Sequence, residues 1–356
     1  MVNIKPLQIG NLVSKLPIIQ GGMGVGVSSS KLAAAVANAG GIGIISGAQI
    51  GYDQEDFYTN NLEANLRALK KHIKTAKENA LNGVIGVNLM VAMKQYDEHV
   101  KAAIEAGVDL IISGAGLPTA LPKLAKGFNV KLAPIVSSLK ACNVILKLWD
   151  KHHGVAPDAI VVEGPKAGGH LGFSKEELIE DNIDFDKIIV DIVEAVKIYE
   201  DKYNKSIPVI AAGGIFTGYD IAKYLKLGAS GVQMATRFVT TEECDAHINF
   251  KNAYLNSSRE DIGIVKSPAG MPGRAIKNPF MKKVELEGSK VTKCYACLTP
   301  CNPATTPYCI TEALINSVKG DVDNGLVFCG ENAYRLDKIV KVQELMDNLE
   351  AEILEA

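Results

Sequence analysis

Eight short, almost purely apolar runs recur along the first two thirds of the chain, and most are followed by a stretch with helical periodicity. Because the runs show no polar alternation, we expect parallel strands that are covered on both faces. Eight such units in succession favour a closed (β/α)₈ TIM barrel, although an open doubly wound sheet remains an alternative. The predicted strands span residues 17–20, 41–46, 84–90, 110–115, 132–137, 159–163, 208–212 and 231–235.

Amphipathic stretches between these runs predict the covering helices. Their ranges are 30–38, 62–80, 98–106, 140–151, 188–202 and 219–227. After Phe238 the repeat stops, and we expect a helical run, a Pro/Gly-rich loop at 267–273, a cysteine-rich segment at 294–309 and a final amphipathic helix near 336–354. We therefore predict two parts. Residues 1–255 form a barrel, and 256–356 form an active-site loop, a four-cysteine segment and a helix packed on it.

Composition narrows the function classes. The hydrophobic fraction of 47% suits a large core, and a net charge of −2 without a long basic run predicts no partner among nucleic acids or anionic membranes. Residues 1–15 lack a signal-peptide pattern, and no run reaches the ~18 apolar residues of a membrane span. We expect a cytoplasmic protein with reduced cysteines.

Glycines follow the first predicted strand, in the string QGGMGVG from Gln20 to Gly26. Glycine at the end of a strand allows the backbone to approach a flat ligand closely. Taken alone, the string is also compatible with a dinucleotide fingerprint or with a tight barrel turn. The fingerprint needs an acidic residue after the second strand, and that strand ends in Ser46.

The last two predicted strands end in a second set of small residues, Gly213-Gly214 and Ala235-Thr236. TIM barrels commonly bind a phosphate with the loops after strands seven and eight, through backbone N–H groups and a helix N-terminus. One phosphate at this point, with a ring over the glycines of the first strand, predicts a mononucleotide such as FMN.

One histidine lies in a glycine-rich loop after the sixth predicted strand. His170 follows Gly168-Gly169, and an imidazole suits proton transfer near neutral pH. A hydrogen bond that only stabilises the loop is the alternative role. The other histidines lie among charged neighbours and are expected at the solvated surface; they are His72, His99, His152, His153 and His247.

Four of the seven cysteines fall within sixteen residues: Cys294, Cys297, Cys301 and Cys309. Four thiolates can hold a [4Fe–4S] cluster or a tetrahedral Zn²⁺. Three closely spaced cysteines with a further one favour the cluster, and four unligated thiols remain the alternative. Cys142, Cys244 and Cys329 are isolated and are expected to be core or surface residues.

The strings QGGMGVGVS, VEGPKAGGHLGF, AAGGI and GASGVQMATRF resemble the nitronate monooxygenase and FMN-dependent enoyl-ACP reductase (FabK-type) superfamily. That resemblance implies that His170 transfers protons beside the flavin. Many relatives have Glu where Lys166 stands and Gly where Ala235 stands. The residues implied to contact FMN are Gly22, Met23, Gly24, Asn88, Glu163, Gly168, Gly213, Gly214, Gln233, Met234, Ala235 and Thr236.

The C-terminal strings KSPAGMPGRAI, TPYCITEAL and GLVFCGENAYRLDKI resemble a narrower branch, the FabX-type acyl-ACP dehydrogenase/isomerases. This resemblance implies FMN and a [4Fe–4S] cluster on the four clustered cysteines. It also implies oxidation of a medium-chain acyl-ACP at Cα–Cβ and isomerisation of the trans-2-enoyl product to cis-3, in unsaturated fatty acid synthesis. Nitronate oxidation, NAD(P)H-dependent enoyl-ACP reduction and a non-enzymatic redox sensor are the alternatives.

The partner is therefore expected to be an acyl carrier protein-linked or small-molecule substrate, and a homodimer is the candidate oligomeric state. An acidic carrier protein would dock on a basic patch near the barrel mouth. The candidates for this patch are Lys266, Arg274, Lys277, Lys282 and Lys283, which would otherwise belong to an ordinary solvated loop.

Overall fold

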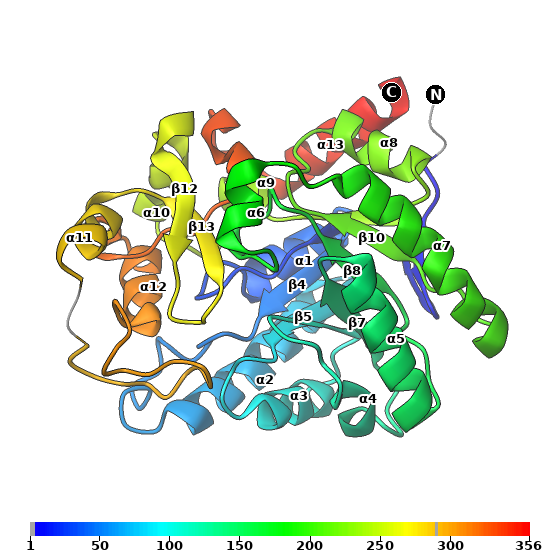
Figure 1. Ribbon diagram of the computed structural model, residues 1–356, viewed down its shortest axis with the longest axis horizontal. Helices are drawn as coiled ribbons and strands as arrows, with labels where there is room; N and C mark the ends of the chain where they lie inside the picture. The colour runs from blue at the N-terminus through cyan, green and yellow to red at the C-terminus, as the bar shows by residue number, and fades with distance from the viewer. Residues whose placement is uncertain (1–3, 289–290) are drawn as a thin grey trace.

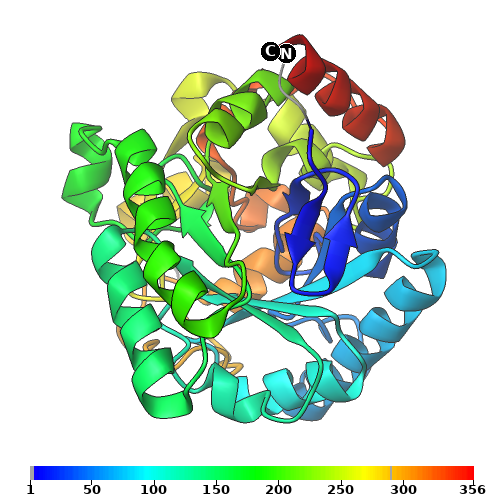
Figure 2. The ribbon, with the colours of Figure 1, turned by 90° about the vertical axis from the view of Figure 1, so that its right-hand side faces the viewer.

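Eight parallel strands close into a barrel in the computed structural model, which describes residues 4–288 and 291–356 (Figures 1 and 2). Pairing of Val232 with Ile18 joins the last strand to the first. The (β/α)₈ prediction is thereby confirmed, and the open sheet is excluded. The strands are β3 (Ile18–Gln20), β4 (Ile42–Ser46), β5 (Val84–Met90), β6 (Leu110–Gly114), β7 (Lys131–Val136), β8 (Ile160–Glu163), β10 (Val209–Ala212) and β11 (Gly231–Met234).

Helices surround the barrel where the amphipathic stretches predict them, to within a few residues. Side-chain caps fix several helix starts; for example, Ser138 accepts from the Ala141 N–H at the start of α5. None of the helices within the described ranges has the length and apolar character needed to cross a bilayer. The helices are α1 (Ser30–Asn38), α2 (Asn61–Asn79), α3 (Tyr96–Glu105), α4 (Leu121–Leu124), α5 (Leu139–His153), α6 (Lys175–Glu180), α7 (Phe185–Tyr203) and α8 (Gly218–Lys226).

One surface prediction was wrong. His99 on α3 is only 2% exposed, and its Nδ1 lies 2.9 Å from the carbonyl oxygen of Gln95. The charged neighbours Glu98 and Lys101 lie on the exposed side of the same helix. The local charge pattern therefore described the opposite face of α3 and not the position of His99.

An N-terminal hairpin, which the pattern did not predict, closes one end of the barrel. It consists of β1 (Leu7–Ile9) and β2 (Leu12–Ser14), and Figure 2 shows it lying across the barrel end. Leu7 and Ile9 are buried in one cluster with inward-facing strand residues such as Ile44 and Ile112. Since apolar side chains fill this end, a ligand site is left to the carboxyl end of the strands.

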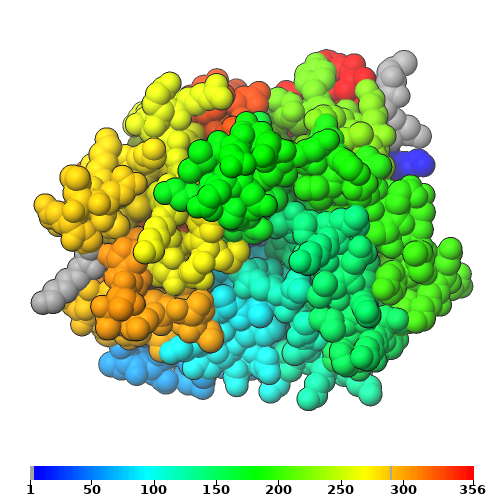
Figure 3. All heavy atoms as spheres, in the orientation of Figure 1, coloured from blue at the N-terminus to red at the C-terminus, as the bar shows by residue number. Residues whose placement is uncertain are grey.

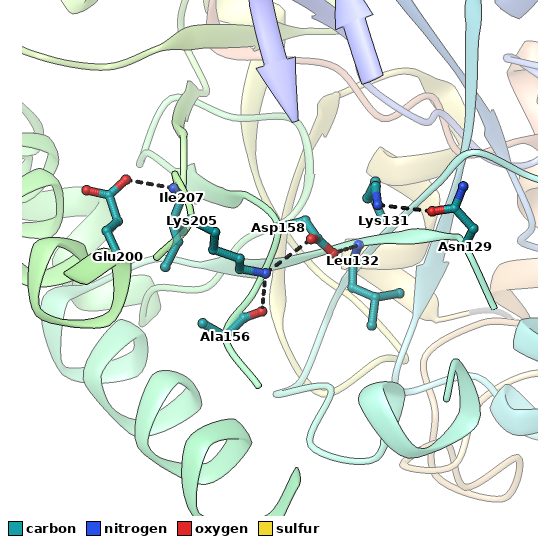
Figure 4. Close-up of polar contacts among 8 residues, drawn as sticks. All are labelled: Asn129, Lys131, Leu132, Ala156, Asp158, Glu200, Lys205 and Ile207. Carbon is teal, nitrogen blue, oxygen red and sulfur yellow. Dashed lines mark hydrogen bonds and ion pairs between the residues drawn. The ribbon is translucent and has the colours of Figure 1, made fainter. Parts of the chain in front are cut away.

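Polar contacts secure the start of the strands at the hairpin end (Figure 4). Lys205 Nζ donates to the carbonyl of Ala156 at 2.7 Å and to Asp158 at 3.1 Å. The same Asp158 accepts from the Leu132 N–H at 2.9 Å. These contacts join the amino ends of neighbouring barrel units, so they stabilise the fold far from the ligand end.

The chain after β11, here called the C-terminal part, mostly covers the carboxyl end of the barrel on the left of Figures 1 and 3, whereas its last helix lies beside α8. The predicted loop at 267–273 includes the turn of a β-hairpin whose two strands the pattern missed. The final helix begins at Val342 and not near 336, because residues 336–341 are extended and Val340 pairs with Thr241. The elements are α9 (Thr236–Val239), α10 (Ile248–Leu255), β12 (Ile262–Lys266), β13 (Pro272–Ile276), α11 (Pro279–Glu287), α12 (Ile310–Val318) and α13 (Val342–Glu355).

The hairpin β12–β13 gains a third strand from the barrel. The short strand β9 (Gly169–His170) pairs antiparallel with β13, with Gly273 opposite His170 and Arg274 opposite Gly169. The loop after β8 and the C-terminal part are therefore joined by main-chain hydrogen bonds.

Helix α13 packs its apolar face on α1 and α8, and Leu345, Leu349 and Ile353 belong to the same buried cluster as the barrel helices. The C-terminal part thus shares one hydrophobic core with the barrel.

Truncation of one buried leucine in α13 tests this shared core. Leu349 is 0% exposed, so Leu349→Ala is expected to lower the free energy of unfolding by about 2–5 kcal/mol, because it leaves a cavity. Leu354 on the same helix is 49% exposed, so Leu354→Ala should change the free energy of unfolding little. Urea unfolding of both variants measures the difference, and equal losses would contradict a shared core.

Candidate active site

One cavity of about 250 Å³ lies at the carboxyl end of the barrel strands. Strand ends, the loop of His170 and the C-terminal part all contribute to its wall. Every residue that the sequence singled out for flavin or proton transfer lines it: Gly22, Met23, Gly24, Asn88, Glu163, Gly168, His170, Gly213, Gly214, Gln233, Met234, Ala235 and Thr236.

The glycines after β3 have neighbours that leave no room for a side chain. A Cβ on Gly22 would lie 2.5 Å from the Asn88 Cβ, and one on Gly24 would lie 2.8 Å from the Ser46 Oγ. Ordinary Cβ contacts begin near 3.4 Å, so both positions require glycine. Bare backbone therefore forms this wall of the cavity.

The loop after β10 also depends on glycine. Gly213 and Gly214 have φ angles of +92° and +84°, a region that L side chains rarely adopt. A Cβ on Gly214 would lie 2.7 Å from the Lys166 Cβ. The end of β11, at Ala235 and Thr236, lines the same part of the cavity.

A buried amide oxygen in the cavity wall is unpaired. Gln233 Oε1 finds no hydrogen-bond donor among the described residues. Buried polar atoms are nearly always hydrogen-bonded, so an unpaired acceptor in a cavity wall indicates a ligand donor. A mononucleotide with a flat ring that carries N–H groups matches this wall. Its ring would lie over the glycine backbone and its phosphate at Gly213-Gly214. The residues present therefore fit FMN.

His170 is held on its outer side. Its Nε2 lies 2.7 Å from Ser267 Oγ, in the turn between β12 and β13, and Phe328 packs edge-on at 5.1 Å between ring centroids. Burial lowers the pKa of His170 from 6.5 to about 4. The imidazole is therefore neutral at pH 7, which is the form that accepts a proton.

Glu163 at the end of β8 is a second titratable group in the wall. Burial raises its pKa to about 7, against the smaller effects of hydrogen bonds from the Gly172 N–H and from Ser137. At neutral pH this carboxyl is therefore divided between its protonated and charged forms.

The C-terminal part supplies wall residues that the sequence analysis missed. Asn332 Nδ2 donates to the Gly214 carbonyl at 2.7 Å, and the Glu331 N–H donates to the Lys166 carbonyl at 3.2 Å. Glu331 and Asn332 lie in the string GLVFCGENAYRLDKI, whose resemblance to the FabX-type branch is the signal that could have found them. The missed residues are Phe250, Tyr254, Leu314, Ser317, Phe328, Cys329, Gly330, Glu331 and Asn332.

A family model for nitronate monooxygenase matches residues 5–352. The chain belongs to the nitronate monooxygenase family. A Staphylococcus aureus (strain Newman) protein described as "Probable nitronate monooxygenase" is 29% identical over 290 residues, which cover 75% of this chain and 77% of that protein. A relative from Staphylococcus saprophyticus with the same description is 29% identical over 297 residues, 77% of this chain and 79% of that protein.

Solved structures agree with this assignment. FabK from Thermotoga maritima is 28% identical, with a TM-score of 0.73 over 95% of this chain and 93% of that chain. Nitroalkane oxidase from Streptomyces ansochromogenes is 21% identical, with a TM-score of 0.73 over 96% of both chains, and shows the fold alone. As a member of this family, the chain is an oxidoreductase.

One residue of the predicted basic patch, Arg274, is buried. Arg274 is 7% exposed, and its Nη1 donates to the carbonyls of Pro165 at 2.7 Å and Ala167 at 2.6 Å. Its guanidinium thus supports the loop before His170 and is not available to a carrier protein. Lys266, Lys282 and Lys283 are exposed.

The cysteine segment packs beside the cavity wall but does not form a metal centre within the described ranges. No group of three or more Cys, His, Asp or Glu side chains there is placed to hold a metal ion. The segment docks through its backbone, since the Lys94 N–H donates to the Cys297 carbonyl and the Thr299 N–H to the Ala92 carbonyl. The four thiols as arranged do not fit a cluster or zinc, and the cluster stays a prediction.

One of the three isolated cysteines, Cys329, lies in the cavity wall. Cys142, Cys244 and Cys329 are all buried, as core residues are expected to be. Cys329 in addition lines the cavity, and burial raises its thiol pKa to about 12. At neutral pH it is an uncharged thiol and no nucleophile.

The low pKa of His170 is open to direct measurement. Its ring signals in NMR, assigned by their loss in His170→Gln, should titrate with a midpoint near pH 4, because burial disfavours the imidazolium. A midpoint near 6.5, the value of a solvated histidine, would contradict the buried environment.

Proposed function

We propose that the chain is an FMN-dependent oxidoreductase in which His170 takes a proton from the carbon next to an activating group of the substrate. The observation that supports it is the position of one neutral, half-buried imidazole in the same cavity wall as the two glycine loops. FMN, when bound, supplies the two-electron chemistry.

The glycine loops would hold the cofactor. Backbone N–H groups at Gly213, Gly214, Ala235 and Thr236 would bind the phosphate, and the ring would lie on Gly22 to Gly24. Gln233 Oε1 would accept a hydrogen bond from the ring, which removes its unpaired state. Asn88, Glu163, Gly168 and Met234 would complete the contact surface.

His170 would act as the base, and its neutral form persists well below pH 7. A base within reach of the reacting carbon contributes typically ~10²–10⁴-fold to the rate. For isomerisation, the same ring would return the proton to a different carbon. Glu163, with a pKa about 7, is close enough to neutrality to exchange protons with solvent or substrate.

The preferred substrate is a medium-chain acyl-ACP, oxidised at Cα–Cβ and isomerised to the cis-3 product. Apolar side chains from several elements line the cavity, among them Met90, Ile135, Phe250 and Leu314, as an acyl chain requires. The FabX-type strings of the C-terminal part support this choice, and exposed Lys266, Lys282 and Lys283 would meet the acidic carrier.

Nitronate oxidation is the second candidate, because the family model and the staphylococcal relatives are described by that activity. Reduction of an enoyl-ACP with NAD(P)H is the third, supported by the likeness to FabK. Neither nitronate oxidation nor enoyl-ACP reduction requires a four-cysteine segment. The presence of that segment therefore favours acyl-ACP oxidation over both.

An assay with His170→Gln tests the proposal. We expect the variant to keep FMN, seen in its visible spectrum, and to lose at least ~100-fold in turnover. In wild type, anaerobic addition of acyl-ACP should bleach the flavin, whereas bleaching by NADH or by a nitronate identifies the other candidates. Wild-type turnover in flavin-loaded His170→Gln would contradict the role of His170.

A single glycine tests the cofactor site. Gly214→Ala forces a side chain into a positive φ and against Lys166, so FMN affinity should fall at least about tenfold, or about 1.4 kcal/mol. Gly154→Ala carries a similar strain at φ +63°, but nothing lies within 4 Å and the site is remote. Fluorescence titration of both apoproteins with FMN should separate them; equal affinities would contradict the cradle.

The [4Fe–4S] cluster on Cys294, Cys297, Cys301 and Cys309 remains a proposal that rests on the family resemblance. Iron and sulfide analysis of anaerobically purified protein decides between the cluster, zinc and free thiols.

A further inference from the structure

Ser267 lies on the far side of His170 from the cavity. His170 lines the cavity, whereas Ser267 is buried in the β12–β13 turn and does not line it. Ser267 Oγ lies 2.7 Å from His170 Nε2. Nε2 therefore faces the C-terminal hairpin and not the ligand.

The other ring nitrogen is open. Within the described residues, His170 Nδ1 has no hydrogen-bond partner, and the atom is not fully buried. An atom with neither a partner nor complete burial is accessible. Since the ring lines the cavity, Nδ1 is the nitrogen that a ligand can reach.

Ser267 is itself held in place. Its Oγ accepts from the Ala269 N–H at 3.2 Å, and its carbonyl accepts from the Gly270 N–H at 3.2 Å. A hydroxyl oxygen can accept two hydrogen bonds, so one acceptor position remains for an N–H of the imidazole. The Leu171 N–H donates to the Pro272 carbonyl at 2.9 Å and Gly169 pairs with Arg274, so the chain is fixed on both sides of His170.

We propose that Ser267 is a positioning residue, which accepts a hydrogen bond from His170 Nε2–H and so leaves the Nδ1 lone pair facing the substrate. This inference rests on the proposed role of His170. A proton then passes from the substrate carbon to Nδ1, and the C–H electron pair stays on the substrate. The Nε2–H bond to Ser267 persists and strengthens, because hydrogen bonds from a charged donor are stronger than those from a neutral one.

The geometry gives the C-terminal hairpin a chemical task. In the familiar arrangement of a catalytic histidine, one ring nitrogen is oriented by a partner so that the other is in the correct tautomer. Here a hydroxyl from residues beyond the barrel repeat supplies that partner.

The tautomer can be measured directly in the flavin-loaded protein. In ¹⁵N-histidine NMR spectra above pH 6, the His170 signals, assigned with His170→Gln, are expected to show a proton on Nε2. Ser267→Ala should shift the population toward Nδ1–H, and Ser267→Thr should restore Nε2–H. A wild-type ring protonated on Nδ1 overturns the inference even if no variant folds.

Kinetics give a second readout. Ser267→Ala should lower kcat roughly tenfold, which corresponds to the loss of one hydrogen bond to a charged group, with KM and FMN content nearly unchanged. Ser267→Thr should regain most of kcat. An unchanged kcat in Ser267→Ala overturns the inference.

Ser258→Ala is the matched control. Ser258 lies just before the same hairpin, and its Oγ donates to Asp261 at 2.7 Å without touching the cavity. Its kcat and its His170 tautomer should stay at wild-type values, and a loss equal to that of Ser267→Ala would assign the effect to the hairpin as a whole. If His170→Gln keeps turnover while wild-type His170 is protonated on Nε2, the proposed function fails and the tautomer assignment stands.

Discussion

Main-chain pairing between β9 and β13 fixes the loop that carries His170, and the proposed chemistry depends on that position. A loop of seven residues after β8, rich in glycine, would sample many conformations on its own. Antiparallel pairing with the hairpin fixes the backbone of Gly169 and His170 at the end of this loop. The pairing therefore reduces the number of conformations that the loop can adopt. Close packing adds to this, since a Cβ on Gly168 would lie 2.5 Å from the Cys329 carbonyl carbon. The C-terminal part is thus a component of the site and not an appendage.

Burial then sets the chemistry of the two titratable groups nearest the glycine loops. The same low polarity acts in opposite directions, lowering the pKa of His170 and raising that of Glu163, because it disfavours whichever form is charged. Pairs of groups whose pKa values are pushed apart from their ordinary values are typical of acid–base sites. In this cavity the result is a neutral base in the same wall as a carboxyl whose pKa is raised toward neutrality.

The cysteine segment occupies a place where it can affect the cavity without entering it. Tyr295, between the first two clustered cysteines, stacks on Phe57 at 5.8 Å, and Phe57 lies in the long loop after β4. Helix α12 follows Cys309 directly, and its Leu314 and Ser317 reach the cavity wall. Helix α12 is therefore the element that connects the cysteine segment to the cavity wall.

The periodic pattern was sufficient for the barrel, because eight apolar runs with intervening amphipathic stretches are compatible with few other folds. The glycine positions also followed from local chemistry, since a positive φ or a contact with backbone allows no other residue. The hairpins β1–β2 and β12–β13 were missed, because each joins two antiparallel strands with no helix between them and so lies outside the strand–helix repeat. The buried state of His99 and Arg274 was missed, because burial depends on which elements pack against a face.

The eight barrel strands, their order along the chain and the glycine backbone at the ligand end could thus be predicted before folding was considered, since they depend on short-range preferences of each residue. Ser267, Phe328 and Asn332 lie 97 to 162 residues from His170 in the chain, and only the folded chain brings them to its site. Contacts of that separation are set by how the C-terminal part packs on the barrel, and no local pattern of residues records it.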